Sequence, residues 1–286
     1  MEFAVLNNGV RIPKLGFGVF QIPREECEES VRAAIDVGYR LIDTAQSYFN
    51  EAEVGKAVAE SGVPREEFFI TTKVWIDNYG YEKTKQSIET SLRKLRTDYI
   101  DLVLLHQPVN DTYAAYRALE CMYEEKKLRA IGVSNFAPDR LADIAAFNRI
   151  VPQVNQVEIN PFFQQVEAQK NMILRHVQPA AWAPFGEGKN NIFSSPILEE
   201  IGSKYKKSAA QVILRWLMQR DIVTLAKSTH AARMKENFEI FDFSLSDEDM
   251  GRIAEMDTKN SMFFDHQSPE TVDRFVHLIE QRRGLV

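Results

Sequence analysis

The sequence predicts a single α/β domain of 286 residues that folds as a TIM barrel, the closed (β/α)8 architecture. The main observation is an alternation of short apolar runs with helical segments, repeated until eight strands are counted. A second observation argues against a doubly wound sheet: Gly16-x-Gly18 is followed by Gln21 where the dinucleotide fingerprint needs its third glycine. Finally, no linker rich in Gly, Ser or Pro interrupts the chain, so we expect one domain over residues 1–286.

A β-hairpin is predicted before the alternation begins. Residues 4–6 and 10–12 are short strands around the turn 7–9, where Asn and Gly tolerate positive φ. Such a hairpin could plug one end of a barrel.

The eight predicted strands are apolar runs bounded by polar or glycine residues. They cover 15–20, 40–43, 68–73, 99–105, 130–133, 153–159, 180–183 and 222–226. Apolar residues on both faces are typical of parallel strands that are covered by helices.

Helical segments follow these strands, with apolar residues spaced for one face of a helix. They cover 25–37, 51–60, 82–95, 112–125, 140–147, 166–176, a segment that opens at residue 208, and 231–237. Ser208-x-x-Gln211 is a capping box. Two extra C-terminal helices are predicted to begin at Ser246 and at Ser268-Pro269, where Ser can cap and Pro can take the first helical position.

Composition limits the partners and the compartment. The formal net charge is −6 with interspersed signs, which argues against nucleic acid as the main partner. The two cysteines, Cys27 and Cys121, form no C-x-x-C pair and suit a reducing compartment. No N-terminal segment resembles a signal peptide and no run is long enough for a membrane span. We therefore expect a cytoplasmic monomer with no membrane partner.

Polar residues stand at the C-terminal ends of the predicted strands, where the active sites of barrels lie. Asp43 ends the second strand, Lys73 the third and His106 the fourth, and Tyr48 lies in the loop after Asp43. Each alone has an ordinary structural explanation, such as a solvated loop residue, a surface ion pair or a packing ring. Jointly, on adjacent strands, they indicate one catalytic rim.

These four residue types together suit proton donation. A free tyrosine titrates near about pH 10, and a neighbouring ammonium such as Lys73 would lower the pKa of Tyr48. Asp43 would hold Lys73 by an ion pair, and His106 would orient a carbonyl oxygen. A carbonyl protonated at oxygen must receive hydride at carbon, so a cofactor is implied. No metal is expected, because the histidines are scattered and H-E-x-x-H is absent.

A series of motifs in order covers nearly the whole chain. They are Leu15-Gly16-Phe17-Gly18, Gly38-Tyr39-Arg40-Leu41-Ile42-Asp43-Thr44-Ala45, Thr71-Thr72-Lys73-Val74-Trp75, Asp98-Tyr99-Ile100-Asp101-Leu102, His106-Gln107-Pro108, Ile131-Gly132-Val133-Ser134-Asn135-Phe136, Asn155-Gln156-Val157-Glu158, and Lys227-Ser228 with Arg233 and Glu236-Asn237. Together they resemble the aldo-keto reductases, closest in type to compact bacterial diketogluconate-reductase-like enzymes. The resemblance implies reduction of an aldehyde or ketone to the alcohol, with NADPH as the hydride source and a small-molecule carbonyl as substrate.

The resemblance also implies roles for individual residues. The catalytic tetrad would be Asp43, Tyr48, Lys73 and His106. The nicotinamide carboxamide would be held by Ser134, Asn135 and Gln156, and the nicotinamide ring would stack on Trp182. The adenosine phosphate would meet Lys227, Ser228, Thr229 and Arg233, the adenine would lie near Glu236 and Asn237, and the substrate would meet Phe20, Phe49, Trp75 and Gln107. The residues themselves agree on NADPH over NADH, because two cations around a helix start suit its extra phosphate.

Four positions depart from the family pattern. Trp182 stands where Tyr is more common and offers a similar face. Ala226 stands where Pro is common and Ala183 where Ser is common, which can shift cofactor affinity. Gln107 stands where many relatives carry Trp, which changes the substrate pocket. The C-terminal tail is short, so we expect a relatively open pocket.

Two other functions stay open from the residues alone. Lys73 could form a Schiff base in a barrel aldolase, with Asp43 and Tyr48 as acid–base partners. Alternatively, the barrel could bind NADPH without catalysis, as a sensor or structural protein. An aldolase would give no role to Ser134-Asn135 or to the segment from Lys227 to Arg233. A protein that only binds NADPH would give no role to the catalytic tetrad.

Overall fold

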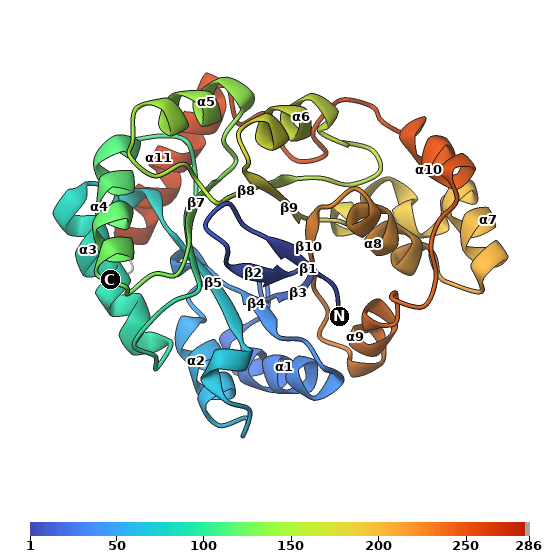
Figure 1. Ribbon diagram of the computed structural model, residues 1–286, viewed down its shortest axis with the longest axis horizontal. Coiled ribbons are helices and arrows are strands. Elements are labelled where there is room, and N and C mark those ends of the chain that lie inside the picture. Colours follow the sequence, from blue (N-terminus) through green and yellow to red (C-terminus); the bar gives the residue numbers. More distant parts are fainter. Residues whose placement is uncertain (284–286) are drawn as a thin grey trace.

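Eight parallel strands close into a barrel in the computed structural model of the chain, which describes residues 1–283 (Figure 1). The barrel strands are β3 (Leu15–Gly18), β4 (Leu41–Asp43), β5 (Phe69–Val74), β6 (Leu102–Leu105), β7 (Ile131–Ser134), β8 (Val154–Glu158), β9 (Gln178–Trp182) and β10 (Val223–Ala226). Neighbours along the chain pair in order, and β10 closes the ring against β3. The predicted fold class is confirmed.

Helices surround this barrel. They are α1 (Arg24–Val37), α2 (Glu51–Ala59), α3 (Tyr81–Lys94), α4 (Thr112–Glu124), α5 (Pro138–Ala146), α6 (Val166–Leu174), α7 (Pro196–Tyr205), α8 (Ala209–Gln219), α9 (Ala231–Phe238), α10 (Asp247–Ala254) and α11 (Pro269–Arg283). The capping box of Ser208 and Gln211 opens α8 as predicted. Among residues 1–283, no helix is both long and apolar enough to cross a membrane.

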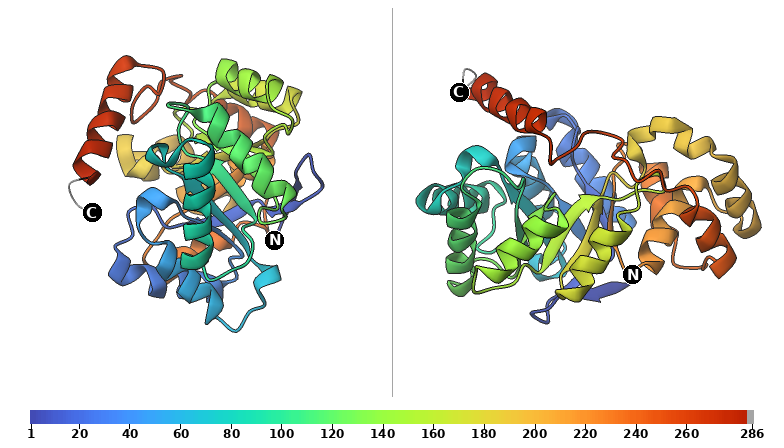
Figure 2. Two further views of the ribbon diagram at one scale, coloured as in Figure 1. Left: turned by 90° about the vertical axis from the view of Figure 1, so that its left-hand side faces the viewer. Right: turned by 90° about the horizontal axis from the view of Figure 1, so that it is seen from above.

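The N-terminal hairpin closes one end of the barrel. Strands β1 (Phe3–Val5) and β2 (Arg11–Pro13) pair antiparallel. Their inward side chains, Ala4, Leu6 and Ile12, join the apolar cluster inside the barrel. Because burial of apolar surface drives this docking, the hairpin is a plug. Figure 2 shows that it lies at the opposite end of the barrel from α11.

The ends of several elements differ from the prediction; for example, the strand predicted over 99–105 is shorter, because β6 covers only Leu102–Leu105. The first barrel strand ends at Gly18, not at residue 20, and the chain then turns through Gln21 with a φ of 59°. Helix α7 was not predicted, although Pro196 at its first turn and the buried Leu198 and Ile201 are ordinary helix signals.

Strands β7 and β8 approach too closely at Gly132 for any side chain. A Cβ there would lie 2.4 Å from the Val154 carbonyl oxygen and 2.8 Å from Leu104 Cδ2. The backbone oxygen belongs to the barrel ladder, since Gly132 and Val154 are register partners. A glycine is therefore needed to keep these two strands paired.

We expect Gly132→Ala to lower the free energy of unfolding by about 1–3 kcal/mol, because the methyl group overpacks the barrel wall. The matched control is Gly251→Ala in α10, where a Cβ meets nothing within 4 Å. That change should raise stability by about 0.5–1 kcal/mol. Urea unfolding measures both, and a Gly132→Ala protein as stable as the parent would contradict the close approach.

Candidate active site

A buried ion pair joins strands β4 and β5 at the C-terminal end of the barrel. Lys73 Nζ lies 2.5 Å from Asp43 Oδ1, and both side chains are at most 5% exposed. Lys73 also donates to the carbonyl oxygen of Thr44 at 3.0 Å. The predicted ion pair is confirmed, and its buried charges are matched by hydrogen bonds as such a pair requires.

Tyr48 lies beside this pair. Its hydroxyl is 3.4 Å from Lys73 Nζ. The tyrosine ends a short 3-10 turn, and the next residue, Phe49, adopts a left-handed conformation with φ of 60°. The three residues that the strand ends and the loop were predicted to bring together, Asp43, Tyr48 and Lys73, do meet.

Polar residues that the sequence analysis did not single out hold the turn that carries Tyr48. Gln46 accepts from Trp75 N–H at 3.0 Å and from the Asn78 amide at 2.8 Å. Buried Asn50 accepts from the Thr44 hydroxyl at 2.8 Å. These contacts anchor both ends of the turn. The sequence does show three polar residues close to Tyr48, namely Gln46, Ser47 and Asn50.

His106 is the fourth member of the cluster. It follows β6 and its ring lies edge-on to the ring of Tyr48, with centroids 5.7 Å apart. Its Nδ1 is 3.4 Å from the Ser47 hydroxyl, and Trp75 packs against its other side at 5.1 Å. The imidazole is thereby fixed next to the phenol.

Lys73 lowers the pKa of Tyr48 as predicted, but the expected net lowering is wrong. Burial raises the pKa of this phenol, and the ammonium of Lys73 lowers it by less, while Asp43 raises it further. The net result is a pKa above the ordinary value of a tyrosine. Burial destabilises the phenolate by more than the attraction of the Lys73 ammonium stabilises it. Tyr48 therefore stays protonated at neutral pH.

Lys73 is held as an ammonium. Burial alone would lower its pKa, but the carboxylate of Asp43 and the neighbouring phenol of Tyr48 together raise it above the ordinary lysine value. A permanently charged Lys73 can stabilise a phenolate that forms on Tyr48 and cannot act as a free amine.

The three residues predicted to hold a carboxamide form one network with the ion pair. The Gln156 amide donates to Asp43 Oδ2 at 2.9 Å, and the Ser134 hydroxyl donates to the Gln156 carbonyl oxygen at 2.8 Å. Asn135 donates to Ser134 Oγ at 3.2 Å. Strands β4, β7 and β8 thus converge on one polar centre.

An aromatic face adjoins this network. The indole N–H of half-buried Trp182 donates to Asn135 Oδ1 at 2.8 Å, and Asn135 in turn donates to the His106 carbonyl oxygen at 3.1 Å. Phe263 packs against the indole with ring centroids 5.2 Å apart. Trp182 is therefore fixed relative to His106 and its neighbours.

The residues predicted to meet the adenosine phosphate and the adenine lie in the segment after β10 and in α9, which contains Arg233, Glu236 and Asn237. Lys227, Thr229 and Arg233 are exposed, Glu236 is half-buried, and Ser228 and Asn237 are buried. In residues 1–283, no carboxylate forms an ion pair with Lys227 or Arg233; the ion pair in α9 joins Lys235 to Glu239. Two cations next to a helix N-terminus form a potential anion site.

The predicted substrate walls differ in exposure. Phe20 and Phe49 are about half exposed, at 49% and 56%, and Phe20 lies 4.9 Å from the Tyr48 ring. Trp75 and Gln107 are buried. The Gln107 backbone is pinned at both N–H and carbonyl by the hydroxyl of Tyr79. Thus Phe20 is a solvent-exposed aromatic ring in contact with Tyr48.

The C-terminal helix reaches this region, which the short tail did not predict. Phe275 of α11 is only 5% exposed and its ring lies 6.0 Å from Trp75. Phe264, in the segment before α11, packs against Phe275 at 6.2 Å. One wall behind the site is therefore built from the end of the chain.

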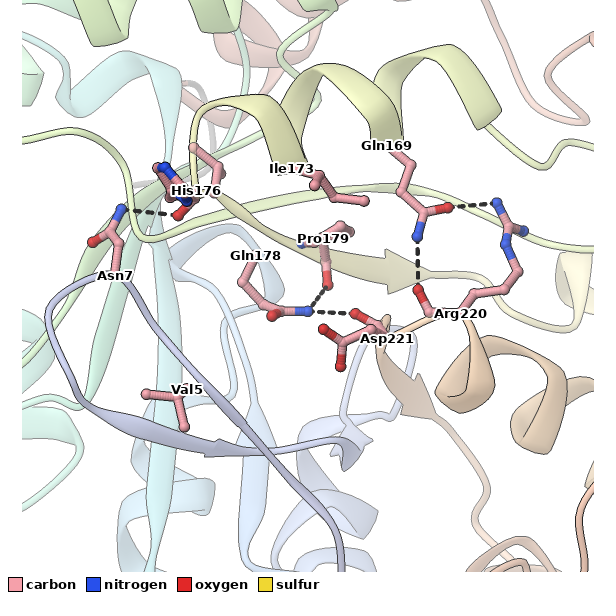
Figure 3. A pocket seen from close by; sticks show the side chains of 10 residues that line it. Val5, Asn7, Gln169, Ile173, His176, Gln178, Pro179, Arg220 and Asp221 are labelled. Atoms are coloured by element: carbon pink, nitrogen blue, oxygen red, sulfur yellow. Dashed lines mark hydrogen bonds between the residues drawn. The ribbon is translucent and has the colours of Figure 1, made fainter.

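A cavity of about 470 Å³ lies at the other end of the barrel, beneath the hairpin (Figure 3). Its amides are already used: Gln178 donates to the Asp221 carbonyl oxygen, Gln169 to that of Arg220, and Asn7 to that of His176. None of the predicted site residues lines this cavity. Among residues 1–283 there is also no group of three His, Cys, Asp or Glu residues that could hold a metal ion.

Comparisons with known proteins agree with this geometry. The family model described as the aldo/keto reductase family matches residues 14–258. The glyoxal reductase of Bacillus subtilis (strain 168) is 47% identical over 250 residues, which cover 87% of this chain and 90% of that protein.

Solved structures of similar proteins share the barrel. One, provisionally described as a 2,5-diketo-D-gluconic acid reductase B, has a TM-score of 0.89 and 40% identity, covering 93% of this chain and 95% of the other. An aldo-keto reductase of Bombyx mori in complex with NADP has a TM-score of 0.88 and 30% identity, covering 92% and 95%.

We expect the Tyr48 hydroxyl to ionise above about pH 10, the ordinary tyrosine value, because burial outweighs Lys73. Its titration is the tyrosinate absorbance of the parent protein minus that of Tyr48→Phe. Lys73→Met should move it to still higher pH. A Tyr48 component that titrates well below the ordinary tyrosine value would contradict the dominance of burial.

Proposed function

Because the chain belongs to the aldo/keto reductase family of carbonyl-reducing oxidoreductases, we propose that it reduces an aldehyde or ketone to the alcohol with NADPH, using Tyr48 as the proton donor. The observation that carries this proposal is the Lys73 ammonium, 2.5 Å from Asp43 and 3.4 Å from the hydroxyl of a protonated Tyr48. In this arrangement the transferable proton is on the hydroxyl oxygen of Tyr48.

The residues of the chain account for the proton side of the reaction. Tyr48 holds its proton until a substrate oxygen gains negative charge, and Lys73 then stabilises the phenolate that is left. Asp43 keeps Lys73 charged and directed at Tyr48. His106, fixed beside Tyr48, is suited to orient the carbonyl oxygen, while Phe20 offers an apolar contact next to the phenol.

The site residues fit a phosphorylated nicotinamide nucleotide. Lys227 and Arg233, with no carboxylate partner in the described chain, suit the extra phosphate, and the flat face of Trp182 lies near the tetrad. When bound, the reduced nicotinamide supplies the hydride for the carbonyl carbon. The NADP complex of the Bombyx mori relative supports the same cofactor here.

A Schiff-base aldolase is disfavoured. That chemistry needs an unprotonated lysine, whereas Asp43 and Tyr48 keep the pKa of Lys73 raised despite its burial. The tetrad therefore supports proton transfer from Tyr48 over covalent catalysis by Lys73.

Tyr48→Phe should reduce NADPH-dependent carbonyl reduction by about 10²–10⁴-fold, because the proton donor is lost while the ring remains. Binding of NADPH, measured by its fluorescence, should change little. Phe20→Leu, which leaves the hydroxyl in place, is the comparison for a packing effect. Wild-type turnover of an aldehyde panel by Tyr48→Phe would refute the role of this residue.

Lys227→Met and Arg233→Met should each weaken NADPH binding by about tenfold and leave NADH binding nearly unchanged, since only NADPH carries the extra phosphate. Titration of each nucleotide gives the two dissociation constants. Lys235→Met is the control, because Lys235 is on the same helix but pairs with Glu239. Equal losses for both nucleotides would show that these cations do not read the phosphate.

A further inference from the structure

A buried carboxyl group, that of Glu158, ends strand β8 two residues after Gln156. Its side chain is only 2% exposed, and burial raises its pKa above the ordinary glutamate value by more than its hydrogen bonds lower it. In the barrel ladder Glu158 is the register partner of Trp182 on β9. Since a buried carboxyl group is costly unless it is hydrogen-bonded, the partners of Glu158 indicate its role.

The segment before α11 is hydrogen-bonded to this carboxyl group. The Ser261 hydroxyl donates to Glu158 Oε2 at 2.6 Å, and the Met262 N–H donates to Glu158 Oε1 at 3.0 Å. The Asn160 amide also donates to Oε1, at 3.1 Å, so both carboxyl oxygens are used. Because Ser261 lies 103 residues after Glu158, these contacts tie the end of the chain to the barrel rim.

The Ser261 hydroxyl links Glu158 to the backbone of the next residues. Ser261 Oγ accepts from the Phe263 N–H at 3.0 Å and from the Phe264 N–H at 3.1 Å. Serine side chains commonly form such a turn with the backbone that follows them. Because the hydroxyl hydrogen is donated to Glu158, the lone pairs of Oγ are left for these two amide groups. Glu158 therefore fixes the turn that carries Phe263 and Phe264.

Rings from this turn and from His266 surround the indole of Trp182. The Phe263 ring lies 5.2 Å from the indole at an interplanar angle of 57°, and the His266 ring lies 6.2 Å from it. Phe264 packs against His266 with ring centroids 4.5 Å apart. Such aromatic pairs stabilise one relative arrangement of their rings. The orientation of Trp182 thus depends on these rings as well as on its hydrogen bond to Asn135.

Building on the proposed function, we propose that Glu158 is a positioning residue, which holds the Trp182 indole in one orientation for stacking of a nicotinamide ring. Glu158 acts through the turn at Ser261 and the ring of Phe263, and not by contact with cofactor or substrate. A side chain that is already immobilised loses less conformational entropy when a ligand binds, so the affinity is higher. Because NADPH and NADH share the nicotinamide, the increase in affinity is the same for both nucleotides.

The test combines calorimetric titration with NADPH and with NADH and acrylamide quenching of Trp182 fluorescence, taken as the parent signal minus that of Trp182→Phe. Glu158→Leu, which accepts no hydrogen bond, should weaken binding of both nucleotides by about five- to tenfold and make Trp182 more accessible to the quencher. Phe263→Leu should have the same two effects with the Glu158 hydrogen bonds left in place. Glu158→Gln keeps an acceptor oxygen and should bind within about twofold of the parent.

Glu120→Leu is the matched control. Glu120 is also 2% exposed and accepts the Ile150 N–H at 2.8 Å, but it lies on α4 and contributes nothing to the candidate site. Its loss should lower stability and leave both affinities and the quenching of Trp182 unchanged.

Parental affinities in Phe263→Leu and in Glu158→Leu overturn this inference and leave the proposed function intact; if Glu158→Leu does not fold, Phe263→Leu decides alone. A loss confined to NADPH also overturns it, since that result indicates the phosphate and not the nicotinamide. A parent protein that binds neither nucleotide overturns both this inference and the proposed function.

Discussion

The candidate site depends on one buried ion pair. Lys73 and Asp43 are charged groups almost without solvent, and each must recover from the protein what it lost in hydration. They do so with partners from several strands: Thr44 supplies a carbonyl oxygen to Lys73, and Gln156 supplies an amide to Asp43. Removing either charge would leave the other buried and unpaired, which typically costs about 3–5 kcal/mol. The pair therefore ties β4, β5 and β8 together at the end of the barrel where the candidate site lies.

The two ends of the barrel differ in polarity: one is apolar, and the other carries the candidate site. At one end Ala4, Leu6 and Ile12 of the hairpin fill the interior with apolar side chains, and Asn7 ties the turn to the carbonyl oxygens of Pro152 and His176. At the other end the strand termini carry charged and polar groups that no apolar core would tolerate unpaired. The hairpin and the barrel interior bury enough apolar surface to hold the strands together. The opposite rim can therefore carry polar residues.

The sequence was sufficient for the barrel, because the strand–helix alternation is local and repeats eight times. It also located Asp43, Lys73 and His106, since each ends an apolar run and parallel strands bring such ends together. The sequence did not predict properties that depend on several contacts between residues far apart in the chain. The Tyr48 pKa depends on how deeply the phenol is buried, and Phe275 reaches Trp75 only through the path of the C-terminal segment. Gln46 and Asn50 flank Tyr48 in the sequence, but their hydrogen bonds to Trp75, Asn78 and Thr44 depend on how the chain folds.

A protonated phenol next to a permanent ammonium suits reduction better than a phenol with a strongly lowered pKa would. If Lys73 dominated, Tyr48 would lose its proton near neutral pH and could not serve as a donor. If burial acted alone, the phenolate left after proton transfer would have no charge partner. Burial and the 3.4 Å contact with Lys73 oppose each other, so the proton is retained in the resting site and its departure leaves a phenolate with a charge partner already in place. In the proposed reaction the ammonium would act chiefly after the proton has begun to move, which is where stabilisation accelerates a reaction.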